Sequence, residues 1–127
     1  MKILVVDDSR LARSTIIKTL KEEIGEDNEV IEAENGQIAV EKYEKDRPEL
    51  VFLDLTMPIM DGFEALKQIK AIDDKAYVVV VSADVQEHAV EKVMSYGAIM
   101  HVQKPINAKK MQEIFKTVKF LLKVESK

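Results

Sequence analysis

The chain has 127 residues, of which 46% are hydrophobic and 33% charged, the balance expected of one folded soluble domain. It contains no cysteine, which excludes a disulfide framework and a thiolate metal site and favours a reducing compartment such as the cytoplasm. The formal net charge of -4 argues against nucleic-acid binding, and no apolar run approaches the roughly 20 residues that cross a membrane.

Short apolar runs alternate with longer amphipathic segments along the chain. In chain order, we expect strands at 2–6, 29–33, 50–55, 77–82 and 99–103. Between and after them we expect helices at about 9–25, 36–46, from 62 onwards, 85–95 and 108–124. The first helix begins beside Ser9, a suitable N-cap residue, and ends at Gly25.

Strands that alternate with helices predict an α/β domain with a parallel sheet and right-handed crossovers. The run 78–81 is apolar throughout, as expected of a strand covered by helices on both faces. The run 29–33 is more polar and is typical of an edge strand. We expect residues 1–127 to form a single domain with no output domain.

Polar side chains follow four of the five predicted strands. They are Asp7 and Asp8, Asp54, Ser82, and Lys104. Because the carboxyl ends of parallel strands lie at one edge of the sheet, we expect these side chains to converge there. Each motif alone has a simpler interpretation as a solvated turn or a helix cap, and Ser82-Ala83-Asp84 could cap the fourth helix.

Three converging carboxylates need a counter-charge. Two of them about 4 Å apart repel by roughly 4 kcal/mol at an effective dielectric constant near 20. Oxygen ligands without histidine or cysteine suit Mg²⁺, which favours sites that a phosphate completes. A lysine and a hydroxyl complete a cradle for phosphoryl transfer, in which a carboxylate can act as the nucleophile.

The strand ends carry a set of spaced motifs, namely Val5-Val6-Asp7-Asp8-Ser9, Leu53-Asp54-Leu55-Thr56-Met57-Pro58, Asp61-Gly62, Ser82-Ala83 and Lys104-Pro105. This set resembles the response-regulator receiver domains of bacterial two-component signalling over essentially the whole chain. The resemblance implies a flavodoxin-like, doubly wound sheet with strand order 2-1-3-4-5 and five helices.

The resemblance also implies the role of each site residue. Asp54 corresponds to the phosphoacceptor, Asp8 to the acid that binds Mg²⁺ directly, and Asp7 to the acid that helps to hold it. The main-chain carbonyl of Thr56 corresponds to the third protein ligand of the metal. Lys104 corresponds to the lysine that pairs with the phosphoryl oxygens, and the peptide before the next proline is expected to be cis.

By the same resemblance, phosphorylation switches a surface formed by the fourth helix, fifth strand and fifth helix. The hydroxyl of Ser82 turns towards the new phosphate, and a buried aromatic residue follows it. That aromatic position holds His101 here, and Ile106 replaces a common phenylalanine. His101 is interpreted as a structural residue, a smaller switch residue or a pH-sensitive one.

The implied partners are a histidine kinase or histidine phosphotransfer protein as donor and a downstream protein as target. The protein is then a monomeric signalling switch and not an enzyme in the usual sense, because it catalyses only its own phosphorylation and dephosphorylation. A chemotaxis-like regulator is the favoured role. The alternative is a phosphorelay intermediate, since histidine at position 101 also occurs in sporulation-type phosphorelay carriers.

Five further positions are candidates for tuning or recognition. Thr56 and Asp84 each lie two residues after a site residue, where they flank the path of water and affect the phosphoryl lifetime, or serve only as turn and cap residues. Arg10, Leu11 and Ser14 lie beside the acid pair and are candidates for contact with the donor. Leu11 is either an exposed anchor or peripheral core.

Three other functions compete with this interpretation. A metal-dependent phosphohydrolase of the haloacid-dehalogenase type would have a second aspartate where this chain has Thr56. A nucleotide or flavin binder would have a glycine-rich turn in place of Asp7-Asp8-Ser9-Arg10. A degenerate receiver would use the fold for protein binding alone, and the intact set of site residues argues against it.

Overall fold

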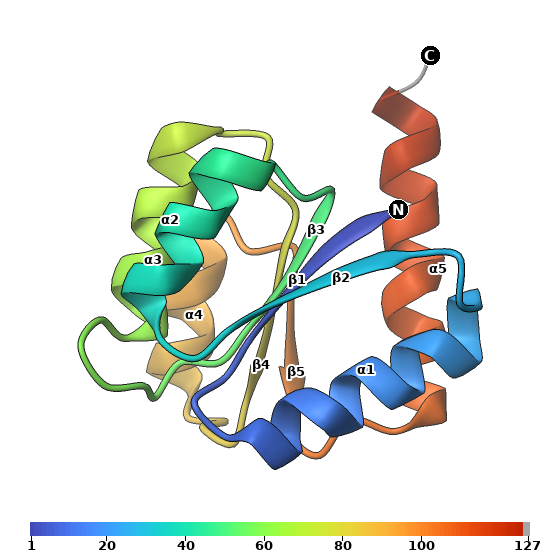
Figure 1. Cartoon of the computed structure of the whole chain (residues 1–127). Helices are drawn as coiled ribbons and strands as arrows, with labels where there is room; N and C mark the ends of the chain where they lie inside the picture. The colour runs from blue at the N-terminus through green and yellow to red at the C-terminus, as the bar shows by residue number, and fades with distance from the viewer. Residues whose placement is uncertain (126–127) are drawn as a thin grey trace.

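A five-stranded parallel sheet runs through the middle of the molecule, with helices on both faces (Figure 1). The computed structural model describes residues 1–125. The strands are β1 (Lys2–Val6), β2 (Glu29–Ala33), β3 (Leu50–Leu53), β4 (Val78–Ser82) and β5 (Met100–Gln103). The helices are α1 (Arg10–Ile24), α2 (Gly36–Asp46), α3 (Gly62–Ile72), α4 (Glu87–Ser95) and α5 (Ala108–Glu125).

The strand order is β2-β1-β3-β4-β5, and every pair is parallel. Helices α1 and α5 cover one face, and α2, α3 and α4 cover the other (Figure 1). The expected doubly wound α/β fold, its strand order and the edge position of residues 29–33 are therefore confirmed.

The central strands are buried on both faces because alternate side chains enter two separate cores. One core joins residues such as Leu4, Val51 and Val80 to α2, α3 and α4. The other joins Val5, Phe52 and their neighbours to α1 and α5. Each fully buried aliphatic or phenylalanine side chain contributes roughly 1.5–3 kcal/mol, so the two cores fix the sheet beneath the site.

Four helices begin at the carboxyl edge of the sheet with a side-chain cap. Ser9 accepts a hydrogen bond from the main chain of Ala12, and Asn35, Asp61 and Asn107 make the equivalent bonds in α2, α3 and α5. These bonds satisfy main-chain N–H groups that the helix leaves free. They also fix the points where the chain leaves the site.

Two predicted boundaries differ from the structure by two residues, each for a local reason, and the others agree to within one residue. The third strand ends at Leu53 rather than at residue 55, because the Leu55 carbonyl accepts a hydrogen bond from Gly62 across the following loop. Helix α4 begins at Glu87 rather than near residue 85, because the Asp84 side chain accepts from the main chain of Gln86 and forms a turn. None of the helices within residues 1–125 has the length and apolar character of a transmembrane span.

Candidate functional site

Three acidic side chains meet at the carboxyl edge of the sheet. Strands β1 and β3 pair in parallel with Val6 opposite Leu53, so the residues that follow them are neighbours. Carboxylate oxygens of Asp7, Asp8 and Asp54 lie within 4.8 Å of one another. Asp7 and Asp54 are buried, with 1% and 6% of their surface exposed, whereas Asp8 is open to solvent.

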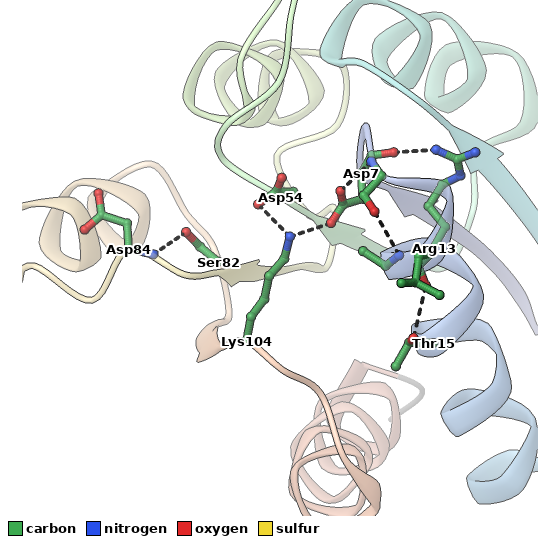
Figure 2. A network of polar contacts seen from close by, with 10 residues as sticks. Asp7, Arg13, Thr15, Asp54, Ser82, Asp84 and Lys104 are labelled. Atoms are coloured by element: carbon green, nitrogen blue, oxygen red, sulfur yellow. Dashed lines mark hydrogen bonds and ion pairs between the residues drawn. The ribbon is translucent and has the colours of Figure 1, made fainter.

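Lys104 reaches this cluster from the segment after β5 (Figure 2). Its Nζ donates a hydrogen bond to Asp7 Oδ2 at 2.6 Å and lies 3.4 Å from Asp54 Oδ1. The main-chain N–H of Lys104 donates to the Ser82 carbonyl, and the Lys104–Pro105 peptide is cis, as the resemblance implies. The lysine therefore bridges two acids that come from different strands.

The charges at this edge are unbalanced, since one lysine faces three carboxylates. Burial raises the pKa of Asp54, the charge of Asp7 raises it further, and Lys104 offsets only part of the rise. Burial alone would lower the pKa of Lys104, but its hydrogen bond to Asp7 and the charges of Asp54 and Asp7 outweigh burial and raise it. Added positive charge would therefore stabilise the ionised acids.

The donor set fits a hard divalent cation. The cluster offers carboxylate oxygens alone, two from buried residues and one from an exposed residue that leaves the cluster open to solvent. Mg²⁺ prefers such ligands and retains water at its remaining positions. The structure thus brings together the acids that the sequence predicts as metal ligands, and Thr56 follows in an exposed loop.

A glycine allows the chain after β3 to turn back onto the main chain of Asp54. A Cβ atom on Gly62 would lie 2.0 Å from the carbonyl oxygen of Asp54 and 2.7 Å from Leu55 Cα, which no side chain can tolerate. The start of α3 can therefore pack directly on the main chain of Asp54. In the same loop Ile59 has φ 69° and is 83% exposed, a strained conformation for a β-branched residue.

Ser82 ends β4 and is buried, but its hydroxyl does not cap α4. It accepts a hydrogen bond from the main chain of Asp84 at 3.0 Å, and Asp84 in turn accepts from Gln86 (Figure 2). The N-cap of α4 is Gln86, which makes no side-chain capping bond. The interpretation of Ser82-Ala83-Asp84 as a helix cap is therefore wrong, and the three residues instead form a turn beside the site.

The remaining predicted residues lie outside the acid cluster. Arg10, Leu11 and Ser14 are exposed at the start of α1, and Leu11 is 78% exposed, which excludes its interpretation as peripheral core. His101 lies on β5 opposite Val80 and is half-buried. Its Nε2 atom is buried and has no hydrogen-bond partner within the described part of the chain.

Arg13 is a site residue that the sequence motifs do not identify. Its Nη1 atom donates a 2.7 Å hydrogen bond to the main-chain carbonyl of Asp7 (Figure 2). The available signal was its position four residues after the N-cap Ser9, which places it one helical turn from the acid pair.

The comparisons with known proteins agree with this geometry. The family model of the response regulator receiver domain matches residues 3–116. The chain is 43% identical over 114 residues to the chemotaxis protein CheY of Listeria monocytogenes, covering 89% of this chain and 93% of that protein. It is 32% identical over 115 residues to sporulation initiation phosphotransferase F of Bacillus subtilis, covering 91% and 90% respectively.

A solved structure of the CheX–CheY–BeF3–Mg complex from Borrelia burgdorferi superimposes with a TM-score of 0.82 at 29% identity. The match covers 93% of this chain and 88% of that chain. Sequence, strand order and the acidic edge of the sheet thus agree, and the chain belongs to the CheY-like response regulator receiver domains of two-component signalling.

Proposed function

We propose that the protein is a response regulator that accepts a phosphoryl group on Asp54 from a phosphohistidine donor in the cytoplasm. One observation carries the proposal: the buried Asp54 carboxylate lies beside Asp7 and Asp8 and within 3.4 Å of the Lys104 ammonium group. A buried carboxylate nucleophile, a pair of acids that can hold a metal ion, and a lysine that can neutralise phosphoryl oxygens suit phosphoryl transfer to a carboxylate.

In the transfer step, a carboxylate oxygen of Asp54 attacks the phosphorus atom. The phosphorus–nitrogen bond to the donor histidine breaks, and its electron pair stays on the imidazole, so an acyl phosphate forms on Asp54. Lys104 already lies between Asp7 and Asp54, so its ammonium group can move to the incoming phosphoryl oxygens. Later, water hydrolyses the acyl phosphate and regenerates the carboxylate.

Asp7, Asp8 and Asp54, together with the Thr56 main-chain carbonyl, would hold Mg²⁺ at this site. The bound cation would neutralise the acids and the phosphoryl oxygens. Thr56 and Asp84 would flank the approach of water and so set the phosphoryl lifetime. The exposure of Thr56 and the turn that fixes Asp84 support this role.

We further propose that phosphorylation releases Ser82 from Asp84. The buried hydroxyl would then donate to a phosphoryl oxygen, and the turn that precedes α4 would move. Strand β4 pairs with β5 at Val80 and His101, so the change can pass to the α4–β5–α5 surface and its target. Lys104→Ala should permit some phosphorylation and uncouple it from this response.

Donor contact is proposed at the start of α1. Arg10, Leu11 and Ser14 are exposed there, and Leu11 borders an apolar pocket of about 240 Å³ between α1 and the β5–α5 segment. Ile106, which replaces a common phenylalanine, also lines this pocket. The downstream protein target is proposed on the α4–β5–α5 surface. The CheY of Borrelia burgdorferi forms a complex with CheX, which supports binding of a second protein to this type of domain.

Two roles within the family are distinguishable. Similarity to CheY proteins favours a chemotaxis-like regulator, whereas the phosphotransferase F relative and His101 favour a phosphorelay intermediate. Incubation of the phosphorylated protein with a histidine phosphotransfer protein separates them, because only a relay intermediate passes the phosphoryl group on efficiently. Sustained turnover of a small phosphate ester would instead support a phosphohydrolase.

The central proposal is tested by intact mass after incubation with acetyl phosphate. We expect a gain of one phosphoryl group in Mg²⁺ and none in excess EDTA. Asp54→Asn removes the nucleophile while keeping the shape of the side chain, so it should abolish the gain. Labelling of Asp54→Asn to the wild-type extent would place the acceptor elsewhere.

A further inference from the structure

Arg13 on α1 connects the acid-bearing turn to the edge strand of the sheet. Its side chain is only 13% exposed. Nη1 donates to the main-chain carbonyl of Asp7 at 2.7 Å, and Nε donates to Glu32 Oε1 on β2 at 2.9 Å. One guanidinium group thus holds the turn after β1 and strand β2 through two different nitrogen atoms, which a lysine cannot do.

The Asp7 carbonyl belongs to the peptide unit that joins Asp7 to Asp8. Because a peptide unit is planar, a hydrogen bond to its oxygen fixes the orientation of the plane and so the direction in which Asp8 begins. The other side of Asp7 is fixed as well, since its N–H donates to Ala33 and its side chain accepts from Ser9. The turn therefore has a defined shape before any ligand binds.

Asp8 depends on this shape more than the other acids do. Asp7 is held by Lys104, and Asp54 is buried with Gly62 packed against its main chain. Asp8 is exposed, and within residues 1–125 no hydrogen bond to its carboxylate is found. Only the main chain sets its direction, and Arg13 is the side chain that contacts the carbonyl of the preceding residue.

Glu32 allows the positive charge of Arg13 to lie near the acid cluster without opposing the proposed Mg²⁺ ion. Its carboxylate pairs with Arg13, which holds the guanidinium group in place and neutralises its charge beside the acid cluster. Lys42 donates to the Glu32 main-chain carbonyl and restrains the same residue of β2. Without Glu32, Arg13 would be an uncompensated positive charge near the proposed cation.

We propose that Arg13, held by Glu32, is a positioning residue that orients the Asp7–Asp8 peptide and thereby strengthens Mg²⁺ binding. This inference rests on the proposed function, since it assumes that the three acids hold a divalent cation. It adds a residue outside the ligand set to the machinery. Loss of such a supporting contact typically weakens metal binding about 10- to 100-fold.

The sign of the effect distinguishes positioning from simple charge. Removal of a positive charge near three acids should tighten Mg²⁺ binding if electrostatics alone decides. Removal of a positioning contact should weaken it. Calorimetric titration of Arg13→Ala with Mg²⁺ should therefore give a dissociation constant at least about tenfold above that of the wild type. Lys18→Ala, which removes an exposed charge from the same helix, is the matched control and should not weaken binding.

Three further measurements keep the test decisive. Arg13→Lys keeps the charge but only one of the two contacts, so its dissociation constant should lie between those of the wild type and Arg13→Ala. Glu32→Gln should also weaken binding, and the double variant Arg13→Ala/Glu32→Gln should be no weaker than Arg13→Ala, because the two residues act as one unit. A purely structural role would lower the melting temperature of these variants without changing the dissociation constant.

If the wild type binds Mg²⁺ and Arg13→Ala has an equal or lower dissociation constant, this inference is overturned and the proposed function stands. A wild-type protein that neither binds Mg²⁺ nor becomes labelled would overturn both. If Arg13→Ala does not fold, Arg13→Lys and Glu32→Gln decide the question, and wild-type affinity in both would reject a positioning role.

Discussion

A pocket at the amino end of the sheet and the acid cluster with Lys104 at the carboxyl end each contain four charged side chains but arrange them differently. At the amino end, a pocket of about 340 Å³ contains Arg47, Glu49, Asp73 and Lys75 beside Tyr43, and its acids and bases are equal in number. At the carboxyl end, three acids share one lysine, and two of the acids are buried. Charge imbalance under burial, rather than charge density, thus distinguishes the end at which we propose phosphoryl transfer.

The imbalance has an energetic consequence. The charges at the amino end are balanced in sign, and surface charges of this kind contribute about 0–1 kcal/mol each, so stability there should change little when one of them is removed. Burial and the neighbouring Asp7 raise the pKa of Asp54, which means that its negative charge opposes folding until a cation arrives. The same substitution at the two ends should therefore have different effects.

The largest expected difference between the two ends is the effect of losing an acid on phosphorylation. Asp8→Ala removes an acid of the cluster and should abolish both Mg²⁺ dependence and labelling by acetyl phosphate, a loss beyond the roughly 10- to 100-fold that follows the loss of a supporting contact. Asp73→Ala removes an acid from the amino end and should be labelled at the wild-type rate. Intact mass as a function of time measures both, and equal labelling of the two variants would show that Asp8 is not required for phosphorylation.

The second largest expected difference between the two ends is the effect of losing a lysine on stability. Lys104→Ala leaves the buried Asp7 without its 2.6 Å partner and should lower the free energy of unfolding by roughly 1–3 kcal/mol in the absence of metal. Lys75→Ala at the amino end should change it by no more than about 0.5 kcal/mol. Urea denaturation measures both. Added Mg²⁺ should reduce the deficit of Lys104→Ala, since it supplies the missing positive charge, and a deficit that Mg²⁺ leaves unchanged would contradict this account.

Stability should also depend on pH through Asp54. Its pKa in the folded state lies above the ordinary value of 3.8, so the folded protein takes up this proton before the unfolded chain does. The contribution to stability is therefore fully present below pH 3.8 and is lost as pH rises through the folded pKa. Urea denaturation over this range without metal should show the loss in the wild type and not in Asp54→Asn. Identical pH profiles would mean that Asp54 ionises as freely in the fold as in the unfolded chain.

The sequence was sufficient for the fold and for the meeting of the acids, because both follow from topology. Apolar runs marked the strands, and once the strands are parallel, the residues after β1 and β3 must be neighbours. The start of α4 was not predictable, because the Asp84 turn competes with the helix for the same main-chain groups.

The contact between Arg13 and Asp7 was also beyond sequence reasoning. A long side chain can reach several acceptors, and only the placement of β2 beside β1 brings Glu32 close enough to hold the guanidinium group. Likewise, the sequence placed Lys104 near the acids but could not show that it bonds Asp7 more closely than Asp54. Side-chain choices of this kind depend on packing that no local pattern encodes.

Relief of backbone strain at Ile59 should have a smaller effect on stability. Ile59 occupies the left-handed region at φ 69° in the loop after Asp54, where a β-branched side chain is unfavourable. Ile59→Asn should raise the free energy of unfolding by about 1 kcal/mol, because asparagine tolerates this conformation and an 83% exposed isoleucine has little burial to lose. Thermal and urea denaturation check it, and a destabilised variant would show that Ile59 makes contacts that outweigh its strain.

The smallest effect is expected at the amino end. Burial raises the pKa of Tyr43 to about 12, and its hydroxyl donates a long, 3.4 Å hydrogen bond to Asp73. Tyr43→Phe should therefore cost less than about 1 kcal/mol near neutral pH and leave labelling of Asp54 unchanged. Because the folded pKa lies above the ordinary value of 10.0, the tyrosine's contribution is present below pH 10 and is lost as pH rises towards 12. The wild type should thus lose its advantage over Tyr43→Phe in this window, and a phenylalanine variant with impaired labelling would show that the two ends of the sheet are coupled.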